Sequence, residues 1–354
     1  MRIVVAMSGG VDSSVAALSL VEEGHEVIGI SMQLYDQQHG ESHFGGCCSI
    51  DDLHDARRTA SQLGIRHYIV NFEKQFNETV VSTFVREYSV GRTPIPCVQC
   101  NGDLKFSHLL ERATALGADY IATGHYVRLA KLAHFGQVTL RKGVDPTKDQ
   151  SYFLFSLTQN QLTRTKFPIG HLTKEEVRSK ARASGLAVAG KPDSQELCFV
   201  PDGKTSNFVE ERAPTVPQPG PIRNSSGLEI GHHTGLHRYT VGQRKGLGLS
   251  TSIPLYVLEL DSARNSLTVG PRGELERTEL TASKVNWIAG PPPDSSRPIT
   301  ARIRHRHPEA SATLALLPGN RVSVAFDEPQ LAVAPGQAVV FYDADTVLGG
   351  GWID

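Results

Sequence analysis

The residues best suited to chemistry in this chain are its cysteines, of which there are five. Cys97 and Cys100 stand three positions apart in IPCVQCNGDLKF, and Cys198 follows in ELCFV. A Cys-x-x-Cys pair can be a redox disulfide, half of a metal site, or a catalytic thiol with a neighbour. Neither Cys100 nor Cys198 lies in a continuous apolar stretch, so packing alone does not explain them. Lys105 and Lys191 would lower a thiol pKa if the fold brings them close.

The other cysteines, Cys47 and Cys48, are adjacent in HFGGCCSIDD. Adjacent side chains point in different directions and make a poor chelate. Together with His43 and the 97/100 pair they form a conceivable zinc site. Their spacing is not that of a known zinc motif, which argues against it.

A second chemical feature is the segment SGGVDSS, residues 8–14, between the apolar run RIVVA and a helical pattern. Its glycines allow a sharp turn and a close approach to a ligand. A loop that opens a helix directs several N–H groups to one point, and that point binds phosphate. Asp12 is placed to hold a magnesium ion beside the phosphates. The loop lacks the Gly-Lys-[ST] of a Walker motif and is not Gly-x-Gly-x-x-Gly. It resembles the loop of the ATP-pyrophosphatases (the PP-loop), which split ATP between its α and β phosphates. The alternative is a strand–helix turn without a ligand.

Length and composition set wider limits. The chain has 354 residues, 39% hydrophobic and 21% charged, which is ordinary for a globular protein of two or three domains. The net charge of −1 gives no general attraction to nucleic acid or membrane. No stretch is long enough to span a bilayer, and MRIVVAMSGG predicts a strand rather than a signal peptide. We therefore expect a cytoplasmic protein, in which thiols stay reduced.

The order of predicted elements indicates an α/β protein. Strands over 2–6, 26–32, 67–72 and 119–124 alternate with helical patterns, which predicts a Rossmann-like PP-loop domain with a parallel sheet over 1–208. Ser49 and Asp52 resemble a capping box before one of these helices. A proline-rich linker then leads to a small β-rich central domain over 209–275 and a C-terminal antiparallel β-barrel over 276–354. Within these, residues 255–270 and 321–343 are each predicted to form a hairpin.

Specific motifs connect these features to a family. SGGVDSS, ATGHYVR, KDQSYFLFSL, KPDSQELCFV, HRYTVGQRKGLGL and APGQAVVFYD occur in the order found in tRNA-specific 2-thiouridylases. The chain resembles that family over nearly its whole length. The resemblance implies ATP-dependent 2-thiolation of the wobble uridine of certain tRNAs. We expect a monomer that binds one tRNA and is supplied with sulfur by a donor protein or a sulfide source, which the sequence does not identify. ATP would adenylate the C2 oxygen of the uracil, and a persulfide sulfur on Cys198 would then be delivered to C2, with release of AMP and pyrophosphate.

The resemblance also assigns residues. Cys100 is the catalytic nucleophile and Cys198 the persulfide carrier. Adenine would be read after the second strand, at Met32, for which a core methionine is the alternative, and at Gly124 in ATGHY. The expected ATP site comprises Ala6, Met7, Ser8, Gly9, Gly10, Val11, Asp12, Ser13, Met32 and Gly124.

Cys97 departs from the common pattern of the family, in which many members have an aspartate three positions before the nucleophile. Three interpretations stay open. Cys97 could be a resolving thiol that forms a disulfide with Cys100 or Cys198. It could join these two as a third ligand of an iron–sulfur cluster. It could also be inert.

RNA contacts are expected in several segments. If ARIRHRH is a strand, Arg302, Arg304 and Arg306 share one face and form a local phosphate-binding stripe. A solvated strand face is the alternative. Enzymes that act on a base usually take it out of the stack, which suits a loop near the nucleophile. By resemblance, the tRNA-contacting residues are Ile95, Pro96, Cys97, His125, Lys148, Asp149, Gln150, Arg304, His305 and Gln337.

Two other functions compete with thiolation. Another PP-loop ligase or amidotransferase would adenylate a small molecule and turn over ATP without RNA or Cys100. The chain has no N-terminal nucleophilic cysteine, which counts against a glutaminase. A non-catalytic RNA-binding module with a Cys-x-x-Cys zinc knot would bind zinc and form no AMP. The ordered motifs favour the thiouridylase.

Overall fold

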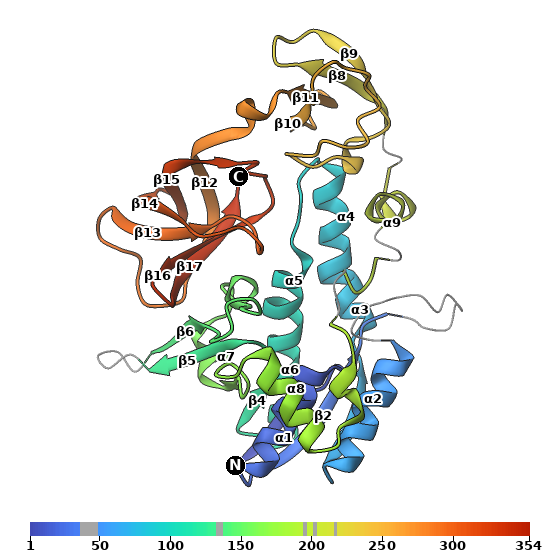
Figure 1. Cartoon of the computed structure of the whole chain (residues 1–354), viewed down its shortest axis with the longest axis vertical. Coiled ribbons are helices and arrows are strands. Elements are labelled where there is room, and N and C mark those ends of the chain that lie inside the picture. The colour runs from blue at the N-terminus through green and yellow to red at the C-terminus, as the bar shows by residue number, and fades with distance from the viewer. Residues whose placement is uncertain (36–48, 132–136, 194–196, 201–203, 216–217) are drawn as a thin grey trace.

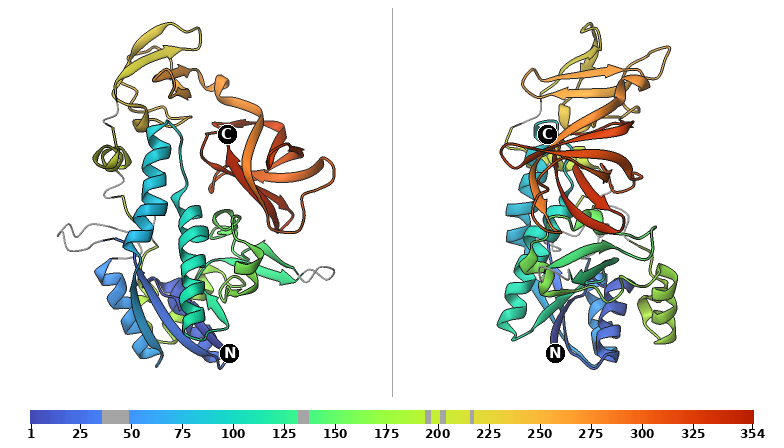
Figure 2. Two further views of the ribbon diagram at one scale, coloured as in Figure 1. Left: turned by 180° about the vertical axis from the view of Figure 1, so that it is seen from behind. Right: turned by 90° about the vertical axis from the view of Figure 1, so that its left-hand side faces the viewer.

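The chain folds into three parts, which the computed structural model arranges along one long axis (Figure 1). An α/β domain lies at one end, a small β-rich domain at the other, and a β-barrel beside the helices that connect them (Figures 1 and 2). The structure describes residues 1–35, 49–131, 137–193, 197–200, 204–215 and 218–354.

The N-terminal domain is built on a parallel sheet with strand order β3-β2-β1-β4-β7. From β1 the order runs to β2 and β3 on one side and to β4 on the other, so the direction of winding reverses beside β1. In open α/β sheets, ligands bind at such a reversal, beyond the carboxyl ends of the strands. The expected parallel sheet is thus confirmed. Its strands are β1 (Arg2–Ala6), β2 (Glu26–Gln33), β3 (Arg66–Asn71), β4 (Tyr120–Ala122) and β7 (Thr165–Lys166).

Helices cover both faces of this sheet because successive strand residues point to opposite sides. Ile3 and Val5 of β1 share a buried cluster with apolar residues of α1 (Val11–Glu22) and α2 (Ile50–Gln62). Val4 faces the other side, in a cluster with residues of α6 (Ser107–Ala115). Both faces are therefore dry, as a parallel sheet requires.

Local signals set the ends of these helices. Ser49 Oγ accepts a hydrogen bond from the N–H of Asp52 at 3.1 Å, and the Asp52 carboxylate accepts one from the N–H of Ser49 at 2.9 Å. The predicted capping box of α2 is thereby confirmed. Gly24 and Gly64 follow α1 and α2 with φ of +78° and +68°, the left-handed conformation that ends a helix.

Two helical columns rise from the sheet toward the β-rich end, side by side in both views (Figures 1 and 2). One runs through α3 (Glu73–Phe76), the π-helical η1 (Asn77–Val81) and α4 (Ser82–Ser89). The other runs through α5 (Pro96–Gln99), the π-helical η2 (Cys100–Phe106) and α6. A π-helix is rare and is found mostly at functional sites.

Short elements connect the columns to the rest of the chain. The hairpin of β5 (Val127–Lys131) and β6 (Val138–Lys142) links the α/β domain to the barrel through a pairing of β6 with the last strand of the chain. Helix α9 spans the boundary that we expected at 208. The remaining elements here are η3 (Ser151–Phe153), α7 (Gln159–Thr163), α8 (Lys174–Ala183), η4 (Ala187–Gly190) and α9 (Thr205–Arg212).

The central domain is a small sheet of order β10-β11-β8-β9 around Ile222, Val257 and Leu267. The predicted hairpin over 255–270 is confirmed, because β10 pairs antiparallel with β11. A short helix, η6 (Leu236–Arg238), rests on the end of α4. The strands are β8 (Gly220–Asn224), β9 (Glu229–His233), β10 (Tyr256–Asp261) and β11 (Ser266–Gly270).

The C-terminal strands close into a barrel in the order β12-β15-β14-β13-β16-β17, with β17 returning to β12. The predicted hairpin over 321–343 is wrong. The segment DEPQ continues one long strand, β15, which pairs with β12 and β14 and not with β16. A short helix, η7 (Arg272–Leu275), precedes β12 (Glu276–Trp287), β13 (Arg297–Arg302), β14 (Ala310–Leu317), β15 (Arg321–Leu331), β16 (Ala338–Asp343) and β17 (Thr346–Ile353).

The barrel and the α/β domain share structure. Thr346 of β17 pairs with Arg141 of β6, which joins the β5–β6 hairpin to the barrel sheet. Tyr152, Phe155 and Leu157 lie in one buried cluster with Val340 and Tyr342 of the barrel. In the described part of the chain, no helix is both long and apolar enough to cross a membrane.

Candidate functional site

The PP-loop lies at the reversal point of the sheet, between β1 and α1. Gly9 has φ of +74°, and a Cβ there would lie 2.1 Å from the carbonyl oxygen of Asp52. Ser13 Oγ accepts the N–H of Ser8 at 3.1 Å and donates to the carbonyl of Gly10 at 3.2 Å. Gly10 caps α1 without a side chain. The first-turn N–H groups of α1 are therefore directed at the loop, which is the arrangement that binds phosphate.

The other expected ATP residues surround this loop. A Cβ on Gly124 would lie 2.6 Å from the N of Ser13, so only glycine lets the end of β4 approach the first turn of α1. Met32 is buried near the end of β2, the strand that pairs with β1, which leads into the loop. The Met7 side chain is buried in the sheet core with Ile3 and Val5. Its backbone is bonded within the protein, because its N–H donates to the carbonyl of Ile30 at 2.8 Å and its carbonyl accepts from Ser31 Oγ at 2.7 Å. Ala6 ends β1, and Val11 is buried in the core beneath α1.

Asp12 is engaged by residues that the sequence did not point to. Lys174 Nζ, from α8, donates to both carboxylate oxygens at 2.8 Å, and Tyr126 donates its hydroxyl at 2.7 Å. Lys174 also contacts Asp193 at 2.7 Å, and Lys148 contacts the same carboxylate at 2.7 Å. Burial opposes ionisation of Asp193, but hydrogen bonds from Lys148 and Lys174 outweigh it and lower the pKa of Asp193 to about 2. Burial, reinforced by Asp12, raises the pKa of Tyr126 well above its usual value.

From the sequence we considered Lys191 as a cation that would lower a thiol pKa, but the structure places its ammonium at carboxylates of α2. Its ammonium lies 2.6 Å from carboxylate oxygens of both Asp52 and Asp55, and 3.2 Å from the carbonyl oxygen of Gly9. It therefore ties α2 to the PP-loop. Together, Lys148, Lys174 and Lys191 bring positive charge to the loop, where a triphosphate would need it.

The fold places Cys100 and Cys198 at one hydrophobic cluster. Cys100 is buried, and Cys198 packs partly buried against the same hydrophobic cluster, which also holds Met32. Sequence reasoning did not foresee this burial, because the apolar neighbours, such as Phe84 and Phe199, come from distant segments. Cys97 lies on α5 and is exposed. Pro96 starts α5, a position at which proline fits a helix because its missing N–H is not needed there.

The segment 148–150 is tied into the protein. Asp149 is buried and accepts hydrogen bonds from Ser151 and from Arg302 of the barrel. Gln150 Oε1 accepts the N–H of Tyr126 at 3.0 Å. Only Lys148 of this segment reaches the charged network at the PP-loop. Asp149 and Gln150 are thus engaged in contacts within the protein, and their expected tRNA contact stays a prediction.

ARIRHRH is not one strand, so the condition for a shared face of three arginines is not met. β13 ends at Arg302, and residues 303–309 form the turn that leads to β14. Arg302 is neutralised by Asp149 and Glu309, so it is not part of a phosphate-binding stripe. Arg304 is half-buried and donates to the carbonyl of Leu331 at 3.1 Å.

Two further expected tRNA residues take part in contacts within the protein. The His305 ring lies 4.4 Å from the ring of Phe153. Burial lowers the pKa of His305, so the ring is neutral at pH 7. His125 shares a 2.8 Å hydrogen bond with Thr123 and lies against Phe106, in the helical column of Cys100.

Gln337 joins the barrel to the cysteine segment. Its Nε2 donates to the carbonyl of Thr93 at 2.8 Å, and the N–H of Thr93 donates to the carbonyl of Pro335 at 2.9 Å. Ile95 and Pro96, both buried, follow directly and lead into α5. The barrel therefore fixes the segment that leads into α5, which carries Cys97 and is followed directly by Cys100.

Among the residues that the structure describes, no group of three or more His, Cys, Asp or Glu is arranged to hold a metal ion. The proposed zinc ligands His43, Cys47 and Cys48 lie outside the described residues. Asp12 is a loop carboxylate of the kind that magnesium uses, but Lys174 holds both of its oxygens. A magnesium ion would contact Asp12 only if Lys174 moved away, so the residues as they stand do not fit the ion.

A glycine-rich loop that opens a helix at the reversal point of a parallel sheet defines a PP-loop protein. Family models match all three parts: a tRNA methyl transferase HUP domain over residues 1–202, a tRNA methyl transferase PRC-barrel domain over 206–271 and an aminomethyltransferase beta-barrel domain over 277–353.

Full-length relatives narrow the class. A tRNA-specific 2-thiouridylase of Geotalea uraniireducens is 55% identical over 358 residues, covering 100% of this chain and 95% of the relative. Those of Geobacter metallireducens and Koribacter versatilis are 52% and 50% identical, covering 100% and 99% of this chain and 96% and 98% of the relatives. The chain belongs to the family of tRNA-specific 2-thiouridylases.

Proposed function

We propose that this protein is an ATP-dependent tRNA-uridine 2-sulfurtransferase, which acts on the wobble uridine. The observation that carries the proposal is the single hydrophobic cluster that contains Met32, Cys100 and Cys198. Met32 belongs to β2, the strand that pairs with β1, and the PP-loop follows β1. A nucleotide held by the loop would therefore lie beside both cysteines. The names of the full-length relatives support the same activity.

The reaction needs two parts of this site, the PP-loop for adenylation and the cysteines for sulfur transfer. The uracil C2 carbonyl is a poor electrophile, and its oxygen would attack the α-phosphate of ATP, with pyrophosphate as the leaving group. The first-turn N–H groups of α1 and the ammonium of Lys174 would stabilise the charge on the phosphates. The product is an O2-adenylated uridine, in which AMP has become a good leaving group.

Sulfur transfer then uses the cysteines. The Cys100 thiolate would attack the inner sulfur of a persulfide on Cys198, which breaks the S–S bond and releases hydrosulfide with the electron pair. Hydrosulfide would attack C2, and AMP would leave. The resulting Cys100–Cys198 disulfide would need two electrons from an external thiol before the next turnover. The apolar walls of the cluster would keep water from competing for the activated C2.

The proposed partners follow from the same chemistry. The substrate is tRNA, which would contact the segment 95–97, His125, Lys148, and the barrel at Arg304, His305 and Gln337. A sulfur-donor protein or a sulfide source would load Cys198. Magnesium would arrive on the ATP phosphates. We expect a monomer that acts in the cytoplasm, where thiols stay reduced.

Cys97 keeps its three interpretations. Its exposed position on α5, one helical turn before Cys100, suits a resolving thiol. An iron–sulfur cluster on Cys97, Cys100 and Cys198 would require these residues to rearrange, since they do not form a ready ligand set. An inert Cys97 predicts full activity in Cys97→Ala.

The test is thiolation with protein purified without oxygen. Unmodified tRNA, Mg-ATP and sulfide are incubated with the wild type, Cys100→Ser and Cys97→Ala, and the nucleosides are then weighed by mass spectrometry. We expect 2-thiouridine with the wild type and none with Cys100→Ser. AMP without thiolated RNA would point instead to a ligase that adenylates a different substrate.

A further inference from the structure

The cysteine proposed as nucleophile opens an unusual helical turn. Cys100 is the first residue of η2, the π-helix over Cys100–Phe106 that interrupts the column between α5 and α6. In a π-helix the hydrogen bonds span five residues instead of four, and the turn is wider and less stable than an α-turn. Something outside the helix must therefore favour this geometry.

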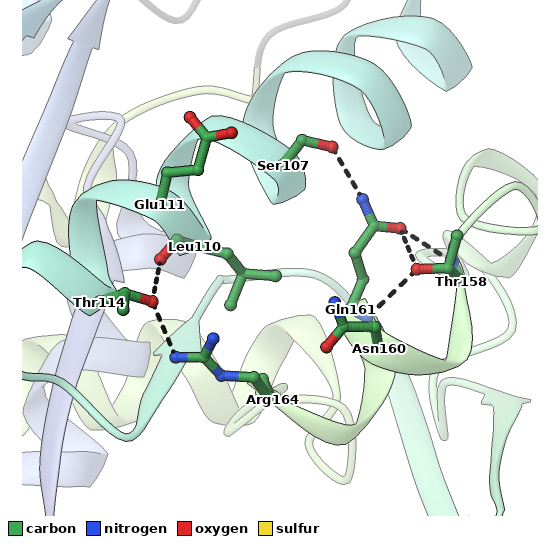
Figure 3. A pocket seen from close by; sticks show the side chains of 8 residues that line it. All are labelled: Ser107, Leu110, Glu111, Thr114, Thr158, Asn160, Gln161 and Arg164. Atoms are coloured by element: carbon green, nitrogen blue, oxygen red, sulfur yellow. Dashed lines mark hydrogen bonds between the residues drawn. The ribbon is translucent and has the colours of Figure 1, made fainter.

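Two side chains hold the carbonyl of Gly102, inside this turn. Ser107 Oγ donates to the Gly102 oxygen at 2.9 Å, and Gln161 Nε2 donates to the same oxygen at 3.0 Å. Gln161 Nε2 also donates to Ser107 Oγ at 3.0 Å, which closes a triangle of the three groups. Figure 3 shows Gln161 of α7 reaching across to Ser107 at the edge of a pocket.

The other end of the Gln161 amide is fixed as well. Its Oε1 accepts the N–H of Thr158 at 2.8 Å and the Thr158 hydroxyl at 3.1 Å, in the capping box that starts α7. The amide nitrogen therefore faces acceptors and the amide oxygen faces donors, so the amide has one favourable orientation. Gln161 is only 8% exposed, and an unsatisfied amide at this depth would be costly.

The segment that carries Gln161 is itself anchored to the barrel. Asn286 of β12 donates to the carbonyls of Phe155 and Leu157, at 2.7 and 3.1 Å. The contact with the π-turn is close, because a Cβ on Gly102 would lie 2.9 Å from Ser156 Oγ. The segment around Ser156, which the barrel holds in place, thus packs against the π-turn that begins with Cys100.

We propose that Gln161, with Ser107, is a positioning residue that holds the π-helical turn and so sets the position and reactivity of the Cys100 thiol. The inference rests on the proposed sulfur transfer, in which Cys100 attacks the persulfide. It makes the amide donor of Gln161, and not merely its bulk, the required group.

The decisive variants separate the two ends of the amide. Gln161→Glu keeps an acceptor for Thr158, since Thr-x-x-Glu is a favourable capping box, but a carboxylate cannot donate to Gly102. Ser107 would also turn its hydroxyl toward the new carboxylate, so the carbonyl would lose both donors. Thr158→Ala is the matched control, because it removes the cap and leaves the donor of Gln161 in place. Asn160→Ala, an exposed neighbour that lines the same pocket, controls for changes at the surface.

The first readout does not depend on thiolation. Alkylation of Cys100 by iodoacetamide is followed against pH, with peptide mass spectrometry to separate Cys100 from Cys97. In Gln161→Glu we expect the Cys100 rate to change by about threefold or more, or its pH midpoint to move, because thiol reactivity follows its local environment. The rates in Thr158→Ala and Asn160→Ala should stay within about twofold of the wild type.

The second readout is 2-thiouridine formation. Gln161→Glu should lower kcat about tenfold, the effect of one misplaced catalytic group, with KM for tRNA and ATP unchanged. An unchanged alkylation profile in a folded Gln161→Glu, or equal losses in Thr158→Ala, would overturn the proposal. If Gln161→Glu does not fold, Ser107→Ala, with a smaller effect in the same direction, decides. If the wild type makes no 2-thiouridine, the proposed function fails, while the alkylation comparison still decides the role of Gln161.

Discussion

The ammonium of Lys174 donates to both carboxylate oxygens of Asp12, at 2.8 Å each. The two residues lie 162 positions apart, one on α8 and one in the PP-loop. Lys174 contacts Asp193 as well, so it lies between two carboxylates that would compete with a bound phosphate for the same cation. We expect ATP to draw Lys174 onto its phosphates and away from Asp12.

Lys174→Ala should therefore weaken the nucleotide step. Loss of one cationic group at a phosphoryl site is expected to lower AMP formation about a hundredfold. The measurement is AMP release with saturating tRNA, together with tRNA affinity in the absence of ATP, which should not change. Lys180→Ala is the control, because Lys180 lies on the same helix and pairs with Glu22 on the surface. Normal AMP release by Lys174→Ala would show that Lys174 has only a structural role.

Asp193→Asn should change how stability depends on pH. The pKa of Asp193 is lowered from 3.8 to about 2, so its ion pairs stabilise the fold above about pH 4 and are lost as pH falls toward 2. After allowance for solvent screening, we expect Asp193→Asn to lower the free energy of unfolding by roughly 1 kcal/mol at pH 7. In urea unfolding at pH 7, 4 and 3, the difference in the free energy of unfolding between wild type and Asp193→Asn should become smaller as the pH falls. Asp294→Asn, at an exposed loop carboxylate, is the control. A difference that is constant over this range would contradict the assignment.

Arg304→Ala and Arg302→Met should separate RNA binding from stability. Arg304→Ala is expected to weaken tRNA binding and to reduce the slope of log K against log salt by about 1, the effect of one lost phosphate contact. Arg302→Met should leave that slope unchanged, because Asp149 and Glu309 already neutralise Arg302. Leaving Asp149 buried without its cation should instead cost about 3 kcal/mol of stability. Filter binding over a salt series and urea unfolding measure the two effects. An unchanged slope in Arg304→Ala would remove Arg304 from the phosphate contacts.

Gln337→Ala should act through the cysteine segment. Its Nε2 is used on the carbonyl of Thr93, so its loss should loosen the entrance to α5 and lower kcat for thiolation about fivefold, with KM for tRNA unchanged. Gly336→Ala is a companion variant, because a Cβ there would lie 3.0 Å from the N of Thr93 and the residue has φ of +88°. It should lower kcat in the same way without removing any amide. Steady-state kinetics with varied tRNA distinguish the cases. A rise in KM for Gln337→Ala alone would favour the direct tRNA contact that the resemblance implies.

Sequence patterns were reliable wherever the governing contacts are local. The alternation of apolar runs and helical patterns predicted the parallel sheet, and Ser49 with Asp52 predicted the start of α2, because these signals depend on neighbours a few positions apart. Local patterns did not show that the strand in ARIRHRH ends at Arg302, and the hairpin predicted over 321–343 was wrong. Both segments have strand patterns, but strand partners are chosen by barrel closure, which no local pattern encodes.

By itself, the sequence determined the PP-loop, the order of the domains and the cysteines that could carry sulfur. Only the tertiary structure decided that Lys174 and Asp193 meet the loop, that Cys100 and Cys198 share one cluster, and that Gln161 supports the π-turn. The physical reason is the same in each case. These partners come from elements far apart in the chain, and their meeting is fixed by the packing of helices on the sheet and of the barrel on residues 151–161, which has no periodic signature in the sequence.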